Sequence, residues 1–107
     1  MHPLFLLSYF AGGATLMNSV PHIVSGAIGR KFPSPFAKPP GKGLSSSLVN
    51  VLWGFFNLAV GYLLIERVGD FDLRSTVDVV CVALGALAIS VMLALTFGKL
   101  HGGDLAR

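Results

Sequence analysis

Residues 79–98 read VVCVALGALAISVMLALTFG, a run of 20 residues without Asp, Glu, Lys or Arg. Two further runs share this property, Leu4–Gly29 and Gly43–Ile65. A helix needs about 20 consecutive, mainly apolar residues to cross a bilayer, and each run reaches that length. We therefore predict an all-α polytopic membrane protein, with one transmembrane domain over residues 1–107 and three transmembrane helices.

The overall composition points to the same class. Hydrophobic residues make up 53% of the chain and charged residues only 12%, whereas about 25% of a soluble domain is charged. A chain of 107 residues has too small an interior to hide that much apolar surface from water. The net charge of +3 comes from few residues, and no long basic run with interleaved aromatic residues is present. The composition therefore argues against a nucleic-acid partner.

The three predicted helices cover approximately residues 4–29, 45–65 and 76–98. A Pro-rich loop over residues 30–43 joins the first two, and its four prolines favour extended, polyproline-like backbone. Pro21 lies inside the first helix and removes a hydrogen bond to the carbonyl of Met17, so a kink or break is expected near Val20. Serines suited to helix N-caps precede the second and third helices, at 45–47 and 75.

Charge asymmetry orients the chain in the membrane. The first loop carries four basic residues and no acidic one: Arg30, Lys31, Lys38 and Lys42. Three crossings place this loop on the same side as the C-terminal tail, which adds Lys99 and Arg107. The positive-inside rule then predicts a cytoplasmic loop and C-terminus, with the N-terminus outside. The four loop cations are also candidates for binding anionic lipid headgroups.

Polar and small residues recur at steps of three and four residues along the first two helices. The candidates on these stripes are Asn18, His22, Asn50, Gly54, Asn57 and Gly61. One interpretation is a helix-packing seam, because small residues allow close approach and amides hydrogen-bond between membrane helices. The other interpretation is a polar pathway or ligand pocket lined by Asn18, His22, Asn50 and Asn57. The third helix has a small-residue row, Ala86, Ser90 and Ala94.

His22 is the only ionisable side chain in the first helix. An ionisable residue within a membrane is a functional candidate, although a structural role is the more economical interpretation of a lone histidine. Cys81 lies in the third apolar run and is expected to act as a small hydrophobic residue. The acidic residues of the second loop suggest a solvated surface. We predict no catalytic residues, no metal site and no cofactor.

Three segments carry a resemblance to known sequences: NSVPH at 18–22, FPSPFAKPPGKGLSS at 32–46 and NVLWGFFN at 50–57. Together they resemble small bacterial integral-membrane proteins of uncharacterised activity. The resemblance covers roughly the first two helices and their loop, and it implies a bacterial source and an inner-membrane location. Small multidrug transporters differ, because they carry an acidic residue in the first helix and this chain has none there.

The functional prediction is a non-enzymatic membrane protein that acts by helix association. It would form a homo-oligomer or serve as an accessory subunit of a larger membrane complex, so its predicted partners are the bilayer and other membrane subunits or itself. The alternative, from a different class, is a small oligomeric channel or transporter with an Asn/His-lined pathway.

Overall fold

The computed structural model describes residues 2–103 and contains three helices and one short hairpin. The elements are α1 Pro3–Ala27, β1 Phe32–Pro33, β2 Leu44–Ser45, α2 Ser47–Glu66 and α3 Thr76–His101. The predicted all-helical class is confirmed. The ends differ slightly: the first helix stops at residue 27 rather than 29, the second starts two residues later than predicted, and the third extends three residues further.

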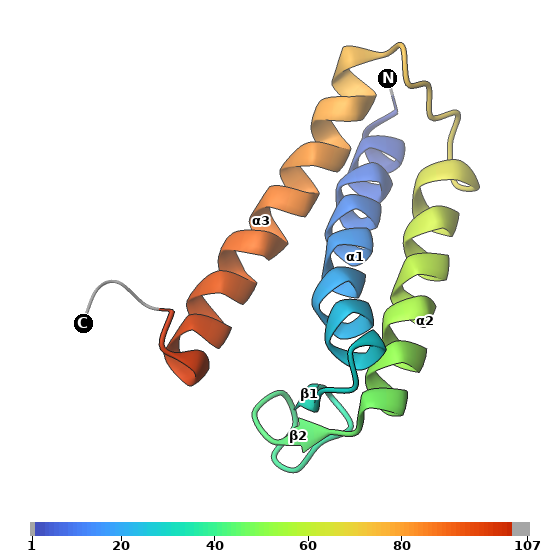
Figure 1. The fold of residues 1–107 in the computed structure, drawn as a ribbon. Coiled ribbons are helices and arrows are strands. Elements are labelled where there is room, and N and C mark those ends of the chain that lie inside the picture. The colour runs from blue at the N-terminus through green and yellow to red at the C-terminus, as the bar shows by residue number, and fades with distance from the viewer. Residues whose placement is uncertain (1, 104–107) are drawn as a thin grey trace.

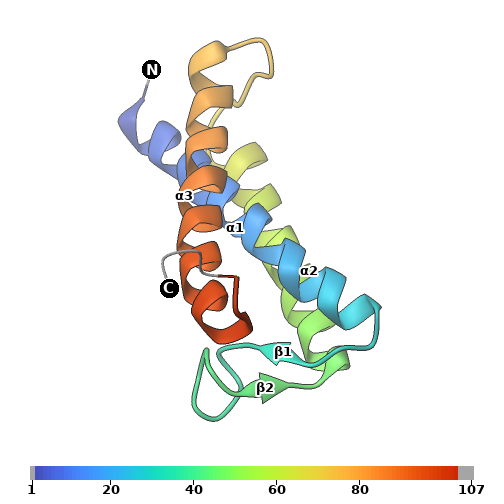
Figure 2. The same ribbon diagram turned by 60° about the vertical axis from the view of Figure 1, so that its left-hand side comes forward.

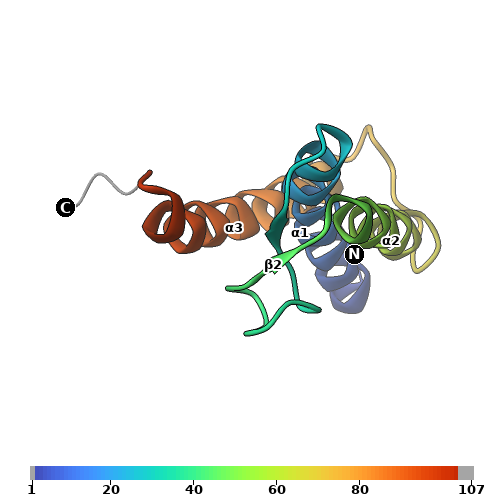
Figure 3. The same ribbon diagram turned by 60° about the horizontal axis from the view of Figure 1, so that its bottom comes forward.

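α1 is the central helix, with α2 on one side and α3 on the other (Figure 1). α2 runs antiparallel to α1, whereas α3 runs in the same direction as α1, so the hairpin and the end of α3 lie at one end of the molecule. α2 and α3 have hardly any direct contact. Figure 2 shows α3 crossing α1 at an angle, and Figure 3 shows the C-terminal part of α3 extending away from the α1–α2 pair. The chain is therefore two helix pairs that share α1.

Local sequence explains where the helices begin. Pro3 occupies the first turn of α1, where its missing N–H costs nothing. Ser46 and Ser75 cap α2 and α3, since their hydroxyl oxygens accept the backbone N–H groups of Val49 and Asp78, both at 3.2 Å. α3 ends at Gly102, whose φ of 79° is the left-handed conformation that glycine adopts readily.

α1 continues through Pro21 as one helix, so of the predicted kink or break the break is wrong, and the kink stays a prediction. Proline removes one backbone hydrogen bond, but α1 packs against α2 on both sides of that position. Before Pro21, the backbone of Ser19 lies against Gly54, and after it Gly26 lies against the first turn of α2. This packing on both sides holds the helix in one piece.

The Pro-rich loop is more compact than the extended segment predicted from its four prolines. β1 and β2 pair antiparallel, with Phe32 opposite Ser45 and Pro33 opposite Leu44. The buried Ser34 organises the turn: its carbonyl accepts the N–H groups of Ala37 at 3.2 Å and Gly41 at 2.8 Å. Its hydroxyl bonds that of Ser45. The polar groups between the prolines therefore fold the loop back on itself.

Two helices are long and apolar enough to cross a membrane. Their most apolar 18-residue windows have mean hydropathies of 1.9 in α2 and 2.6 in α3, and only 6% of the α3 window is buried within the chain. A core helix of a soluble protein would be mostly buried instead. α1 falls outside this pair, because its serines, asparagine, proline and histidine lower its hydropathy. The prediction of three spans is thus supported for two helices only.

Candidate functional site

The buried polar residues of α1 and α2 meet in the interface between these two helices. His22 and Asn50 form one pair, with 2.7 Å between the imidazole Nδ1 and the amide Oδ1. Asn18 and Asn57 form a second pair, in which Asn18 Nδ2 donates to Asn57 Oδ1 at 3.1 Å. We call these four residues the polar seam. The structure thus brings the four predicted polar candidates together, in two pairs.

Asn50 is the best-connected residue of the seam and is fully buried, with 0% of its surface exposed. Its Nδ2 faces three backbone carbonyls, those of Phe32 and Ser46 at 3.0 Å and of Ser45 at 3.2 Å. Three acceptors around Nδ2 fix the orientation of the amide, so Oδ1 must point to His22. His22 Nδ1 must then carry a hydrogen and donate it. Asn50 therefore ties together α1, α2 and the hairpin.

Glycines separate the amides along α2 and let the two helices approach closely. A Cβ atom at Gly54 would lie 3.0 Å from the backbone nitrogen of Ile23, and one at Gly61 would lie 3.1 Å from the carbonyl oxygen of Gly12. Such backbone approach is typical of membrane helix pairs. Both predicted glycine candidates thus lie in the same interface as the polar seam.

The contact between α1 and α3 uses residues that the sequence analysis did not single out. A Cβ atom at Gly85 would lie on the carbonyl group of Phe10, and one at Gly13 would lie on the carbonyl group of Val82. The predicted row Ala86, Ser90 and Ala94 lies beside and beyond this crossing. The adjacent pair Gly12–Gly13 was the available signal, because neighbouring residues on a helix face different partners: Gly12 faces α2 and Gly13 faces α3.

A cavity of about 160 Å³ adjoins the seam between α1, α2, the hairpin loop and α3. Asn18 and His22 line it from α1, Trp53 from α2 and Ser34 from the loop. Trp53 Nε1 is buried without a hydrogen-bond partner, a state that only it and Tyr9 Oη show among the buried side chains of residues 2–103. Trp53 thus lines the same cavity as Asn18 and His22, whose side chains are already bonded to other seam residues.

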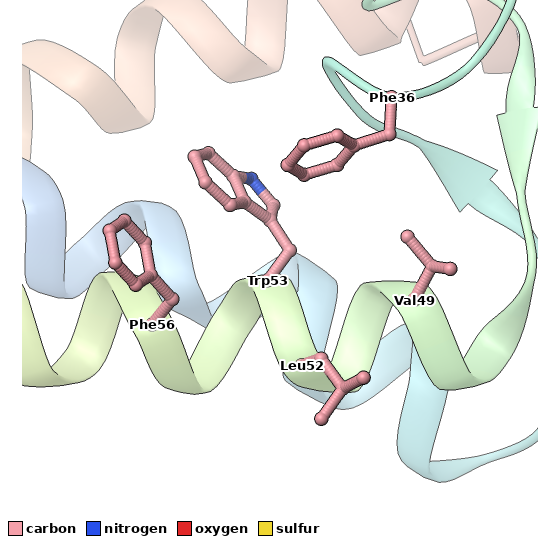
Figure 4. A pocket seen from close by; sticks show the side chains of 5 residues that line it. All are labelled: Phe36, Val49, Leu52, Trp53 and Phe56. Atoms are coloured by element: carbon pink, nitrogen blue, oxygen red, sulfur yellow. The ribbon is translucent and has the colours of Figure 1, made fainter.

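Trp53 also contacts the hairpin loop through Phe36 (Figure 4). Phe36 reaches from the loop to Trp53, with ring centroids 5.2 Å apart and nearly perpendicular planes, while Phe56 stacks on Trp53 at 5.6 Å. These rings and Val49 and Leu52 line an open apolar groove of about 500 Å³ on the outer side of α2. The five lining residues are apolar or aromatic and include no side chain suited to acid–base or nucleophilic catalysis. The groove therefore suits contact with lipid or another apolar surface.

The four basic candidates of the first loop divide into two pairs. Arg30 and Lys31 line a depression of about 610 Å³ together with His101 from the end of α3. Lys38 and Lys42 are exposed farther along the loop and do not line it. His101 was not among the predicted site residues; its ring contacts those of Phe97 and Phe32, with ring centroids 6.0 and 5.9 Å apart.

Acidic side chains gather at the opposite end of the molecule, around the α2–α3 loop. Asp78 is buried there, and its carboxylate accepts the backbone N–H of Asp72 at 3.1 Å. Asp72 in turn accepts the N–H of Arg74 at 2.9 Å. These carboxylates hold the loop in shape, and residues 2–103 contain no group of three or more His, Cys, Asp or Glu placed to hold a metal ion.

Four hydroxyl groups of α1 and α3 donate to backbone carbonyls rather than to a base. Thr15 donates to Ala11, Ser19 to Leu16 and Ser90 to Ala86, each on its own helix, and Ser8 donates to the Leu64 carbonyl across the interface. These hydroxyls therefore act within and between helices, and within residues 2–103 the side chain of His22 bonds Asn50 and no hydroxyl.

Comparisons with protein families, with curated proteins and with solved structures found no match to this chain.

Proposed function

We propose that this chain is a three-span bacterial inner-membrane protein that acts without enzymatic activity, by associating with other membrane helices. It would do so as a homo-oligomer or as an accessory subunit of a larger complex. One observation carries the proposal: the polar residues of α1 and α2 bond one another within a single chain, while apolar side chains cover the outer faces of α2 and α3. Its surface is thus suited to apolar contacts and not to a water-filled interface.

The position of α1 supports its inclusion as a third span. Its 25 residues are about 37 Å long, more than the ~30 Å of a bilayer core. It lies between the two apolar helices, so it enters the membrane with them (Figure 1). Three of the residues that lower its hydropathy, Ser8, Ser19 and His22, are buried, whereas exposed positions such as Leu4, Leu7 and Val24 are apolar.

The charges of the described residues favour a cytoplasmic hairpin. Five basic residues and no acidic one lie at the hairpin end: Arg30, Lys31, Lys38, Lys42 and Lys99. The other end carries two basic and four acidic residues: Arg67, Arg74, Glu66, Asp70, Asp72 and Asp78. Arg107, which also belongs to the predicted cytoplasmic side, lies outside the described residues. The positive-inside rule supports an external N-terminus.

Thiol labelling from outside the cell tests this orientation. In a Cys81→Ser background, we expect Leu73→Cys to react with a membrane-impermeant maleimide and Lys38→Cys to react only after the cells are opened. Both positions are exposed, Leu73 to 80%, so accessibility within the fold does not limit either reaction. Labelling of Lys38→Cys in intact cells, with Leu73→Cys protected, would reverse the proposed orientation.

Association is tested by in-membrane cross-linking together with a mass measurement in mild detergent. We expect a particle heavier than one chain, and cysteine cross-links through the outward positions Leu87 or Leu95 of α3, because α3 packs mainly against α1 and leaves its other side uncovered. Leu52→Cys on the outer side of α2 is the matched comparison. A monomeric mass, with no cross-linked product from either helix, would contradict the proposal.

A small oligomeric channel or transporter is the second candidate function. The cavity lined by Asn18, His22 and Trp53 favours it, since polar side chains form part of its wall. Conduction would require this cavity to connect to both ends of the membrane. The Asn18–Asn57 and His22–Asn50 bonds instead direct the polar groups towards each other, which is why we rank association first.

A further inference from the structure

α1 and α3 diverge beyond their crossing at Gly13 and Gly85, and an apolar groove of about 440 Å³ lies between them. Its walls include Met17 and Val20 from α1 and Leu93, Ala94 and Phe97 from α3. Ser90 is the one hydroxyl residue in the wall, and its hydroxyl donates to the Ala86 carbonyl of its own helix at 2.7 Å. The groove therefore offers contacts for hydrocarbon and leaves no hydrogen bond to be made.

The lower end of this groove continues into the basic depression described above. Pro21, Val24 and Phe32 line both, so the two spaces are contiguous. Arg30, Lys31 and His101 surround the depression, together with Ser25, and none of the acidic residues within 2–103 lines it. The acidic residues at 66–78 lie at the far end of the helices. The apolar groove thus ends at the depression lined by basic residues.

We propose that this composite site binds one anionic phospholipid of the cytoplasmic leaflet. One acyl chain lies between α1 and α3, and the phosphate lies at Arg30, Lys31 and His101. Guanidinium and ammonium groups bind phosphate through charge-assisted hydrogen bonds. The groove from Val24 to Met17 follows about 10 Å of helix, which accommodates the upper part of an acyl chain. The inference rests on the proposed membrane location but not on association.

Charge argues against a second copy of this chain in the same place. In a parallel arrangement within the membrane, the hairpin end of a neighbouring copy brings basic residues, and its acidic loop lies at the opposite end. A free phosphate ion would satisfy the depression but leave the groove unfilled. A lipid with an anionic headgroup complements both parts of the site.

The test is native mass spectrometry of delipidated protein in detergent, titrated with phosphatidylglycerol or with phosphatidylcholine of the same acyl chains. Membrane fractionation first establishes that each variant resides in the membrane, so failure of the proposed location is seen separately. We expect one phosphatidylglycerol bound with clear preference over phosphatidylcholine. The double variant Arg30→Gln/Lys31→Gln should weaken binding about 25-fold, since each basic side chain near an anionic headgroup contributes roughly a factor of five.

Lys38→Gln/Lys42→Gln is the matched control, because it removes the same charge from the same loop outside the site. It should leave binding within about twofold of the original. Ala94→Phe fills the groove from an exposed position without changing charge, and it should also abolish the preference. Equal losses in the two double variants would overturn the proposal in favour of diffuse attraction.

Two other outcomes would also overturn it. If Ala94→Phe binds phosphatidylglycerol normally and inorganic phosphate competes with it, the site recognises a phosphate alone. If Ala94→Phe changes the mass of the protein assembly while lipid binding is absent in every variant, the groove holds a protein helix.

Discussion

Gly85→Ala is expected to weaken the packing of α3 on α1, although alanine is the better helix former. Alanine favours a helix over glycine by about 1 kcal/mol, so helix propensity alone predicts a more stable protein. At this position, however, the new Cβ would lie on the Phe10 carbonyl and 3.1 Å from the backbone nitrogen of Ala14. Backbone cannot rotate away as a side chain can, so the helices must separate. We expect a net loss of about 2 kcal/mol, within the range for overpacked sites.

Gly12→Ala is the matched control for this substitution. It makes the same chemical change in the interior of α1, but its Cβ lies closest to the side chain of Ile65 and 3.1 Å from the Gly61 carbonyl oxygen, so smaller shifts make room for it than at Gly85, where the Cβ lies on a backbone carbonyl. The gain in helix propensity then offsets most of the cost, and the change should stay below about 1 kcal/mol. Unfolding by SDS titration in mixed micelles measures both variants. A Gly85→Ala protein more stable than the original would show that α3 is not held at this crossing.

The α1–α2 interface was largely predictable from the sequence. Asn50, Gly54, Asn57 and Gly61 recur at steps of four, three and four residues, which places them on one face of a helix. A membrane helix hides such a face from lipid because lipid offers no hydrogen bonds. The same argument applies to Asn18 and His22. Periodicity therefore identified the interface residues of each helix. Since both polar faces must be hidden from lipid, the two faces were expected to pack against each other.

The pairing within that interface was not predictable, because a stripe of amides fits several registers. Asn50 reaches three carbonyls of the hairpin region only because that loop folds back, and the prolines of the loop suggested extension instead. The α1–α3 crossing depends on Gly85. Apolar residues occupy nearly all faces of α3, so no spacing pattern in the sequence marks Gly85 as a contact residue. Pro21 predicted a break that packing prevented. In each case tertiary contacts decided what local sequence left open.

Asn50→Leu is expected to release the hairpin loop and to destabilise the α1–α2 pair. Leucine has similar volume but leaves His22 Nδ1 and the carbonyls of Phe32 and Ser45 without the Asn50 side chain, whereas the Ser46 carbonyl keeps the backbone N–H of residue 50 as a partner. An unsatisfied buried polar group costs about 1–3 kcal/mol, and relaxation of the loop toward water should recover part of this. We expect a net loss of about 3 kcal/mol. Trypsin should also cleave after exposed Lys42 faster than in the original protein.

Two variants separate this role from general damage to the seam. Asn57→Leu removes the bond to Asn18 and the bond to the Trp53 carbonyl, but it touches no loop carbonyl. It should destabilise the helices while the loop resists trypsin in the folded protein. His22→Gln keeps a donor for Asn50 Oδ1 and should lose less than about 1 kcal/mol, the scale of one hydrogen bond between membrane helices. If Asn50→Leu and Asn57→Leu expose the loop equally, the hairpin is held by its own turn and by Phe36 on Trp53, and Asn50 acts only between the helices.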